Sequence, residues 1–266
     1  MRLCIISDIH SNHLALESCI KDISNLNIDT IIFNGDILTD FPYPNKTMEL
    51  IMSLKDKYNI ILIKGNREEY ILSDLKYNGT NGSLIYTKEN LDKKYFIALK
   101  EASDYYEVSS DIIVCHAKID NKNELYYYDS KNTIEYLNNT NYKYTIIGHS
   151  HKPFIKELNN KYLINTGPLG HLNKEYDGGS YLIFDTLNNE FEIKYAIYDK
   201  LKAKMEFVES NLYKIGGIYS ECIMDMLDNN IPIASNVIKL GYELMGDNPY
   251  DEKYFIEAYR YYKYLI

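Results

Sequence analysis

The first 150 residues alternate short apolar runs, polar turns and segments with helical periodicity. The apolar runs lie at residues 3–6, 30–33, 60–63, 112–115 and 145–147. Because their apolar residues are consecutive rather than alternating, the runs predict strands covered on both faces, as in α/β sheets. Helical spacing predicts helices over 12–26, 46–58 and 89–102, with Ser11 or Asn12 capping the first.

The pattern changes after Pro153, where shorter runs are separated by turn residues. These runs, at 154–158, 162–165, 181–184 and 191–198, predict antiparallel hairpins. Beyond Asp199 helical periodicity continues to the end of the chain. We therefore expect a main domain over residues 1–200 and a helical extension over 201–266 that packs on it.

Residues that can bind a metal follow each of the five predicted strands. In chain order they are Asp8 and His10, Asp36, Asn66, His116, and His149 and His151. Since the carboxyl ends of strands form the ligand crevice of an open α/β sheet, we expect these side chains to converge. Carboxylates and imidazoles together are the ligands of divalent transition metals. The pattern predicts a site for two such ions.

Each motif alone also has a structural explanation. A carboxylate before a helix often caps it, and a glycine followed by Asp or Asn often marks a turn. Five separate turns would not place their polar residues at equivalent strand ends in this order. The arrangement as a whole therefore favours a metal site.

The five blocks resemble those of the calcineurin-like metallophosphoesterases, which run DxH, GD, GN, H and GHxH in the same order. The resemblance covers about residues 1–185, and Asn165-Thr166-Gly167-Pro168 is similar to a segment of the small bacterial and archaeal phosphodiesterases. It implies a four-layer α-β-β-α sandwich, in which two mixed sheets are flanked by helices. The hairpins after Pro153 would form the second sheet.

The resemblance also implies roles for individual residues. Asp8, His10 and His151 would bind a first ion, and Asn66, His116 and His149 a second, with Asp36 between the two. The implied ions are Mn, Fe, Zn, Co or Ni. Asp36, Arg67 and His149 would take part in catalysis, in which a hydroxide bridging the ions attacks phosphorus in line.

Arg67 departs from the family pattern, since many members carry histidine there. A guanidinium keeps its proton, so Arg67 can bind a phosphate oxygen but cannot act as a general acid. We therefore expect good leaving groups to be preferred, unless His13 or His171 supplies the proton. Asn12 and Asn66 are the other expected substrate contacts, Asn12 because a helix N-terminus attracts anions.

Composition narrows the range of partners. The formal net charge of −9 disfavours coating of long nucleic acids, although bound cations would reverse the charge locally. The four cysteines are far apart, which fits buried thiols rather than a disulfide framework. No apolar run approaches the roughly 18 to 20 residues of a membrane helix, so we expect a cytoplasmic protein that makes no membrane contact.

The expected function is hydrolysis of a small phosphodiester or nucleotide-like substrate. A protein Ser/Thr phosphatase, a dinucleoside polyphosphate hydrolase and a catalytically weak metal-binding interaction module stay open as alternatives. The tyrosines at 126–128 either pack in the core or stack on a nucleobase. The amphipathic helix at the C-terminus docks on the domain or on a second copy of the chain, which leaves a homo-oligomer open.

Overall fold

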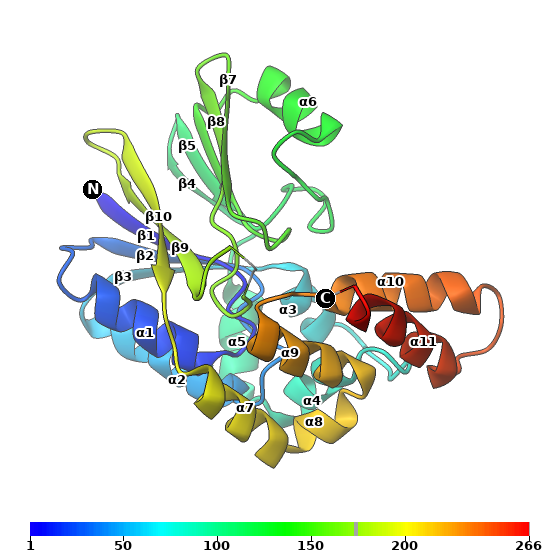
Figure 1. Ribbon diagram of the computed structural model, residues 1–266. Helices are drawn as coiled ribbons and strands as arrows, with labels where there is room; N and C mark the ends of the chain where they lie inside the picture. The colour runs from blue at the N-terminus through cyan, green and yellow to red at the C-terminus, as the bar shows by residue number, and fades with distance from the viewer. Residues whose placement is uncertain (173–174, 266) are drawn as a thin grey trace.

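The computed structural model describes residues 1–172 and 175–265, and within them two mixed sheets of five strands face each other (Figure 1). The first sheet has the order β10 (Glu190–Ala196), β9 (Gly179–Asp185), β1 (Arg2–Ile6), β2 (Thr30–Asn34) and β3 (Asn59–Ile63). The second has the order β4 (Tyr105–Ser109), β5 (Ile112–Cys115), β6 (Tyr144–Ile147), β8 (Lys161–Asn165) and β7 (Phe154–Leu158). Each sheet contains three neighbouring parallel strands: β1, β2 and β3 at one side of the first sheet, and β5, β6 and β8 in the centre of the second.

Helices cover the outer face of both sheets. They are α1 (His13–Ile23), α2 (Pro44–Ser53), the 3₁₀ helix η1 (Leu54–Asp56), α3 (Asn66–Leu72), α4 (Gly82–Asn90), α5 (Lys93–Glu101), α6 (Lys131–Asn139), α7 (Lys200–Glu209), α8 (Asn211–Ile215), α9 (Ile218–Asn229), α10 (Ala234–Met245) and α11 (Glu252–Lys263). In Figure 1, α1 and α2 lie against the first sheet and α6 against the second. The predicted four-layer sandwich is confirmed.

The alternation of side chains along β1 explains the layers. Leu3 and Ile5 pack between the sheets, whereas Cys4 and Ile6 pack against the helices on the other face. All four side chains are fully buried. A strand buried on both faces needs apolar residues at every position, which is the pattern that its sequence shows.

The prediction that the hairpins after Pro153 form the second sheet by themselves is wrong. The β7–β8 hairpin joins β4, β5 and β6, whereas the β9–β10 hairpin pairs with β1 in the first sheet. The five apolar runs are likewise divided between the two sheets. β2 pairs with the backbone N–H and C=O groups along only one edge of β1, and the antiparallel strand β9 pairs with those along the other edge.

Helix boundaries differ from the sequence pattern at one instructive place. The single helix expected over 89–102 is broken after Asn90, and α5 starts at Lys93. The side chain of Asn45 stabilises the break: its amide donates to the carbonyl of Asn90 at 2.9 Å and accepts from the backbone of Asp92 at 2.8 Å. The cap of α1 is as predicted, since Asn12 accepts from the backbone of Ala15.

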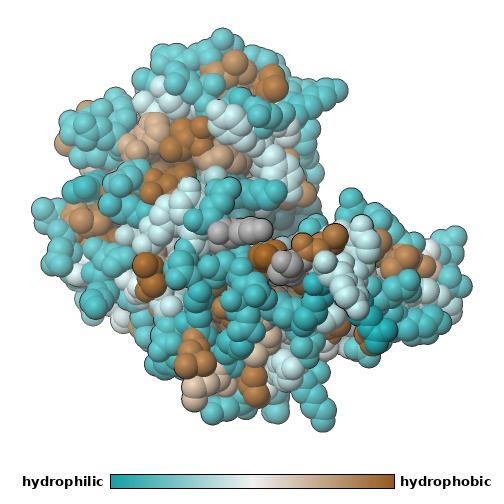
Figure 2. Space-filling model, viewed as in Figure 1, coloured by the Kyte–Doolittle hydropathy of each residue, from teal (hydrophilic) through white to brown (hydrophobic). Residues whose placement is uncertain are grey.

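The helical extension shares the core of the main domain. Phe207, Ile223 and Met226 are buried in the same cluster as the helices on the first sheet, while α10 and α11 pack on α9 and project to the right in Figure 1. Figure 2 shows a mostly hydrophilic face, with hydrophobic surface gathered in the seam between the sheets. Among the described helices, none combines the length and apolar character needed to span a bilayer.

Candidate metal centre

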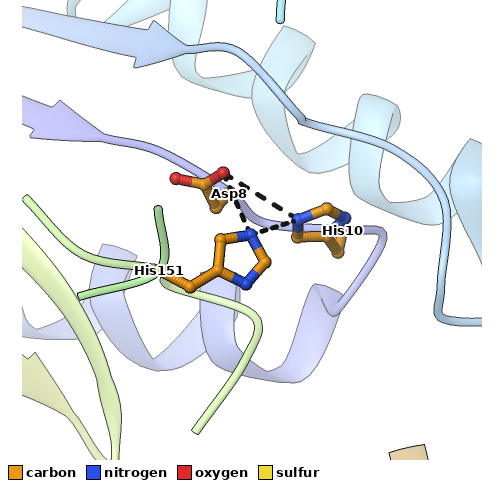
Figure 3. A group of neighbouring side chains, drawn as sticks. All are labelled: Asp8, His10 and His151. Carbon is orange, nitrogen blue, oxygen red and sulfur yellow. Dashed lines mark hydrogen bonds and ion pairs between the residues drawn. The ribbon is translucent and has the colours of Figure 1, made fainter. Parts of the chain in front are cut away.

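The loop after β1 and the loop after β6 bring three predicted ligands together at one end of the sheets (Figure 3). His151 Nε2 lies 3.3 Å from Asp8 Oδ1 and 3.1 Å from His10 Nε2. His10 Nε2 lies 3.9 Å from the same Asp8 oxygen. The three side chains therefore point at a common position, although 141 residues separate His10 from His151.

A second cluster forms beside the first from Asp36, His116 and His149, whose ligand atoms all lie within 4.8 Å of one another. Asn66, the first residue of α3, points its amide into this cluster, at 3.1 Å from His149 Nδ1 and 3.3 Å from His116 Nε2. Its carbonyl oxygen faces these acceptors, although hydrogen bonding among protein atoms alone would favour the nitrogen. A cation between them would take the oxygen.

Asp36 lies between the two clusters. Its Oδ1 is 3.4 Å from His116 Nε2, and its Oδ2 is 3.9 Å from His10 Nε2. The two oxygens of one carboxylate thus face different sets of ligands, which is the arrangement that a residue shared by two ions requires.

Hydrogen bonds on the far side of two imidazoles fix their orientation. His116 Nδ1 lies 2.8 Å from the carbonyl oxygen of Asn34 and donates to it. His10 Nδ1 lies 3.2 Å from Thr39 Oγ1 and 3.1 Å from Asp40 Oδ2. A proton held on Nδ1 leaves the lone pair of Nε2 facing the clusters, which is how metal-binding histidines are usually held.

The electrostatics of the clusters favour a cation. Burial by itself raises the pKa of Asp8, yet His151 and His116 lower it to about 2. Burial opposes protonation of His116, but Asp36 and Asp8 raise its pKa to about 10. Asp8 Oδ1 is also buried without a hydrogen-bond partner among the described residues. The residues present thus fit divalent metal ions, whose charge would balance the carboxylates.

Backbone strain is concentrated at the predicted ligands. Asp8, His10, Asp36, His149 and His151 all have φ between 49° and 66°. Non-glycine residues rarely adopt this left-handed conformation, which costs on the order of 1–3 kcal/mol each and is found mainly at functional sites.

Two glycines let the backbone approach the ligands closely. A Cβ atom on Gly65 would lie 2.2 Å from Asp36 Oδ1, and one on Gly148 would lie 2.6 Å from Asp8 Oδ2. Neither position therefore accepts a side chain without displacing a carboxylate.

Sequence reasoning missed two carboxylates that support the centre. Glu68 is fully buried and accepts the backbone N–H groups of Gly65, Asp36, Ile37 and, at 3.3 Å, Leu38. Its position at the third residue of α3 is the signal that could have found it, because an acid there often caps the helix. Asp40, behind His10, has no comparable local signal.

Three residues expected at the substrate have other partners. Asn12 is buried and uses both ends of its amide, accepting from Ala15 and donating to the carbonyl of Gly170. His13 is buried with Nε2 3.4 Å from Glu206, and burial lowers its pKa to about 3. His171 stacks on His10, and burial likewise lowers its pKa to about 3.

A cavity of about 980 Å³ opens beside the candidate metal centre, and Arg67 lines it. Asp36, Asn66, His149 and His151 form one side of it. Arg67 Nε lies 3.9 Å from Asp36 Oδ2, and its backbone N–H donates to Asp36 at 2.8 Å. The expected substrate contacts Arg67 and Asn66 therefore lie where a ligand can reach them.

Known proteins resemble this chain in sequence or in fold. A protein of Methanocaldococcus jannaschii, described as uncharacterized, is 29% identical over 232 residues, which make up 79% of this chain and 93% of that one. The crystal structure of a hypothetical protein from Pyrococcus horikoshii has a TM-score of 0.74 at 18% identity and covers 85% of this chain and 97% of its own. That of a metallophosphoesterase from Sphaerobacter thermophilus has a TM-score of 0.72 at 20% identity and covers 87% of this chain and 100% of its own.

The family model of the calcineurin-like phosphoesterase superfamily domain matches residues 1–189, which include every residue of the two ligand clusters. Because this match spans most of the chain, the protein belongs to the calcineurin-like phosphoesterase superfamily.

Proposed function

We propose that the protein is a phosphodiesterase that uses two divalent metal ions to hydrolyse a small, nucleotide-like phosphodiester. One observation carries the proposal: a single cavity connects the candidate ligands Asp36, Asn66 and His149, which line it, with a wall of aromatic side chains. A phosphoryl group at the ligands and an aromatic substituent on the wall would fill it together.

The chain supplies all the groups that hold the ions in this proposal. Asp8, His10 and His151 would hold one ion, Asn66, His116 and His149 would hold the other, and Asp36 would be shared between them. Mn, Fe, Zn, Co and Ni all suit these ligands. Bound there, the ions would lower the pKa of water toward about 7 and neutralise the phosphoryl oxygens.

Arg67 binds and orients the phosphoryl group in this proposal. Its guanidinium is about a quarter exposed, faces the cavity, and is flanked by Asp36 at 3.9 Å and Asp40 at 4.0 Å. Burial by itself lowers the pKa of Arg67, but Asp40 and Asp36 raise it above its usual value, so it stays charged and donates hydrogen bonds rather than protons. His13 and His171 do not line the cavity, so a leaving group would depart without help from either.

The aromatic wall supports a substrate with a base or another ring. Tyr127 and Tyr128 line the cavity and are 38% and 50% exposed, whereas Tyr126 is buried beside α6. Phe154 packs edge-on against Tyr128, with ring centroids 6.3 Å apart. Exposed rings beside a phosphate site offer stacking worth about 1–3 kcal/mol per base.

Hydrolysis of model esters tests the proposal. We expect the protein, freed of metal by chelation and reloaded with Mn²⁺, to cleave bis-p-nitrophenyl phosphate faster than p-nitrophenyl phosphate, and aryl esters faster than alkyl esters. The chelated protein should be inactive. A panel of cyclic nucleotides, dinucleoside polyphosphates and phosphopeptides then separates the phosphodiesterase from the related activities. Mn²⁺ binding without turnover of any of these would favour an interaction module instead.

Replacing Arg67 by methionine should lower kcat/KM for bis-p-nitrophenyl phosphate by about 10- to 100-fold, because the variant loses charged hydrogen bonds to the phosphoryl oxygens. Steady-state kinetics measure this loss. Arg260→Met is the matched control, since Arg260 is exposed on α11 away from the cavity. Equal rates for the two variants would exclude the role assigned to Arg67.

The cysteines bear on where this enzyme works. All four are buried and free. Buried free thiols fit a reducing compartment, and we propose the cytoplasm.

A further inference from the structure

Asp40 connects the candidate metal centre to the helical extension. It is buried, and its Oδ2 lies 3.1 Å from His10 Nδ1 and 3.3 Å from His171 Nε2. Its other oxygen accepts the hydroxyl of Ser83 at 3.1 Å. Asp40 is therefore the carboxylate that holds the His10 imidazole from behind.

Tyr219 of α9 completes the contacts of Asp40. Its hydroxyl donates to Asp40 Oδ2 at 2.7 Å, a shorter distance than those from His10, His171 and Ser83 to that carboxylate. The hydrogen bond spans 179 residues and joins the extension to the loop that follows β2. Without it, Oδ2 would lose the donor that fixes its direction relative to His10.

We propose that Tyr219 is a positioning residue: through Asp40 it orients His10 toward the first metal ion, so the helical extension forms part of the metal centre. This inference rests on the proposed binding of ions by Asp8, His10 and His151. Tyr219 itself touches neither ion nor substrate. Its contribution is the direction in which His10 Nε2 points.

The position of the contacts explains why the effect should be local. His10 belongs to the first cluster, whereas His116 is oriented by the carbonyl of Asn34, whose described hydrogen bonds are to His116 and Ser7, outside the extension. Loss of the Tyr219 hydroxyl should therefore weaken the binding of one of the two ions and leave the binding of the other unchanged. Partners that orient a ligand in this way typically contribute about 10- to 100-fold in metal affinity.

Mn²⁺ titration of the full-length, metal-free protein tests the inference, with the electron paramagnetic resonance signal of free Mn²⁺ as the readout. We expect Tyr219→Phe to weaken one of the two Mn²⁺ sites by roughly 10-fold. Tyr213→Phe is the matched control, because the Tyr213 hydroxyl donates to Glu221 inside the extension at 2.6 Å. Its two Mn²⁺ affinities should equal those of the unaltered protein.

Hydrogen exchange gives a second readout that a general loosening would not reproduce. Because coupling between sites is reciprocal, Mn²⁺ should slow amide exchange in α9 of the unaltered protein and of Tyr213→Phe, but not of Tyr219→Phe. Unchanged Mn²⁺ affinity in Tyr219→Phe, or an equal loss in Tyr213→Phe, would overturn the inference and leave the proposed function standing. Failure of the unaltered protein to bind Mn²⁺ would overturn both.

Discussion

Asp36→Asn is expected to lower kcat/KM for bis-p-nitrophenyl phosphate by at least about 10³-fold, because in the proposed function several kcal/mol of transition-state stabilisation depend on the paired ions. Asp36 is the residue whose two oxygens face both ligand clusters. Asparagine keeps the shape and can still accept the backbone N–H of Arg67, so the fold should survive. The variant loses the negative charge and one of the two oxygens.

Kinetics with saturating Mn²⁺ measure this effect, and equilibrium dialysis counts the ions that stay bound. We expect the variant to bind fewer of them. Asp56→Asn serves as control, since Asp56 is exposed in η1 and belongs neither to the cavity lining nor to the ligand clusters. Turnover of Asp36→Asn within tenfold of the unaltered protein would contradict the shared role of this carboxylate.

Glu68→Ala should reduce the free energy of unfolding of the metal-free protein by about 3–5 kcal/mol, because buried backbone N–H groups would lose their hydrogen-bond acceptor. Four N–H groups of two loops converge on this one fully buried side chain. Denaturant titration measures the loss. The same change should weaken metal binding, since Glu68 holds the backbone on which Asp36 is carried.

Glu69→Ala is the matched control for this experiment. Glu69 is the next residue of α3, and its exposed carboxylate pairs with Lys122 at the surface. We expect the free energy of unfolding of Glu69→Ala to fall by less than about 1 kcal/mol. If Glu68→Ala does not fold, Glu68→Gln, which preserves the shape and one acceptor, still allows the measurement. A loss below about 1 kcal/mol in Glu68→Ala would show that water can replace the carboxylate.

Local sequence patterns predicted the parts of this fold that local forces determine. The continuous apolar run of β1 indicated a strand covered on both faces, and Asn12 indicated where α1 starts. The edge strand β4 alternates exposed and half-buried residues, so its run was not apolar enough to detect. Which sheet the last hairpin joins depends on the open edge of β1, and no property of the hairpin itself encodes that.

The same distinction holds at the candidate site. Ligand types and their order along the chain were enough to predict a cluster, and the structure brings all seven predicted ligands to one place. Glu68, Asp40 and Tyr219 act through contacts between elements distant in sequence. Such contacts leave little trace in a single sequence, because any one of these residues is an ordinary helix or loop residue in its own segment.

The distance along the chain between Asp8 and His151 has a consequence for how the protein would acquire the metal ions proposed for it. The ligand set is complete only after both sheets have formed and docked, so an emerging or unfolded chain offers only scattered histidines and carboxylates. Such loose ligands follow the general affinity order of divalent metals, in which copper binds most tightly. Specific metal binding would therefore follow the folding and docking of both sheets. The folded loops, and the pool of ions that the finished protein meets, then decide which metal it carries.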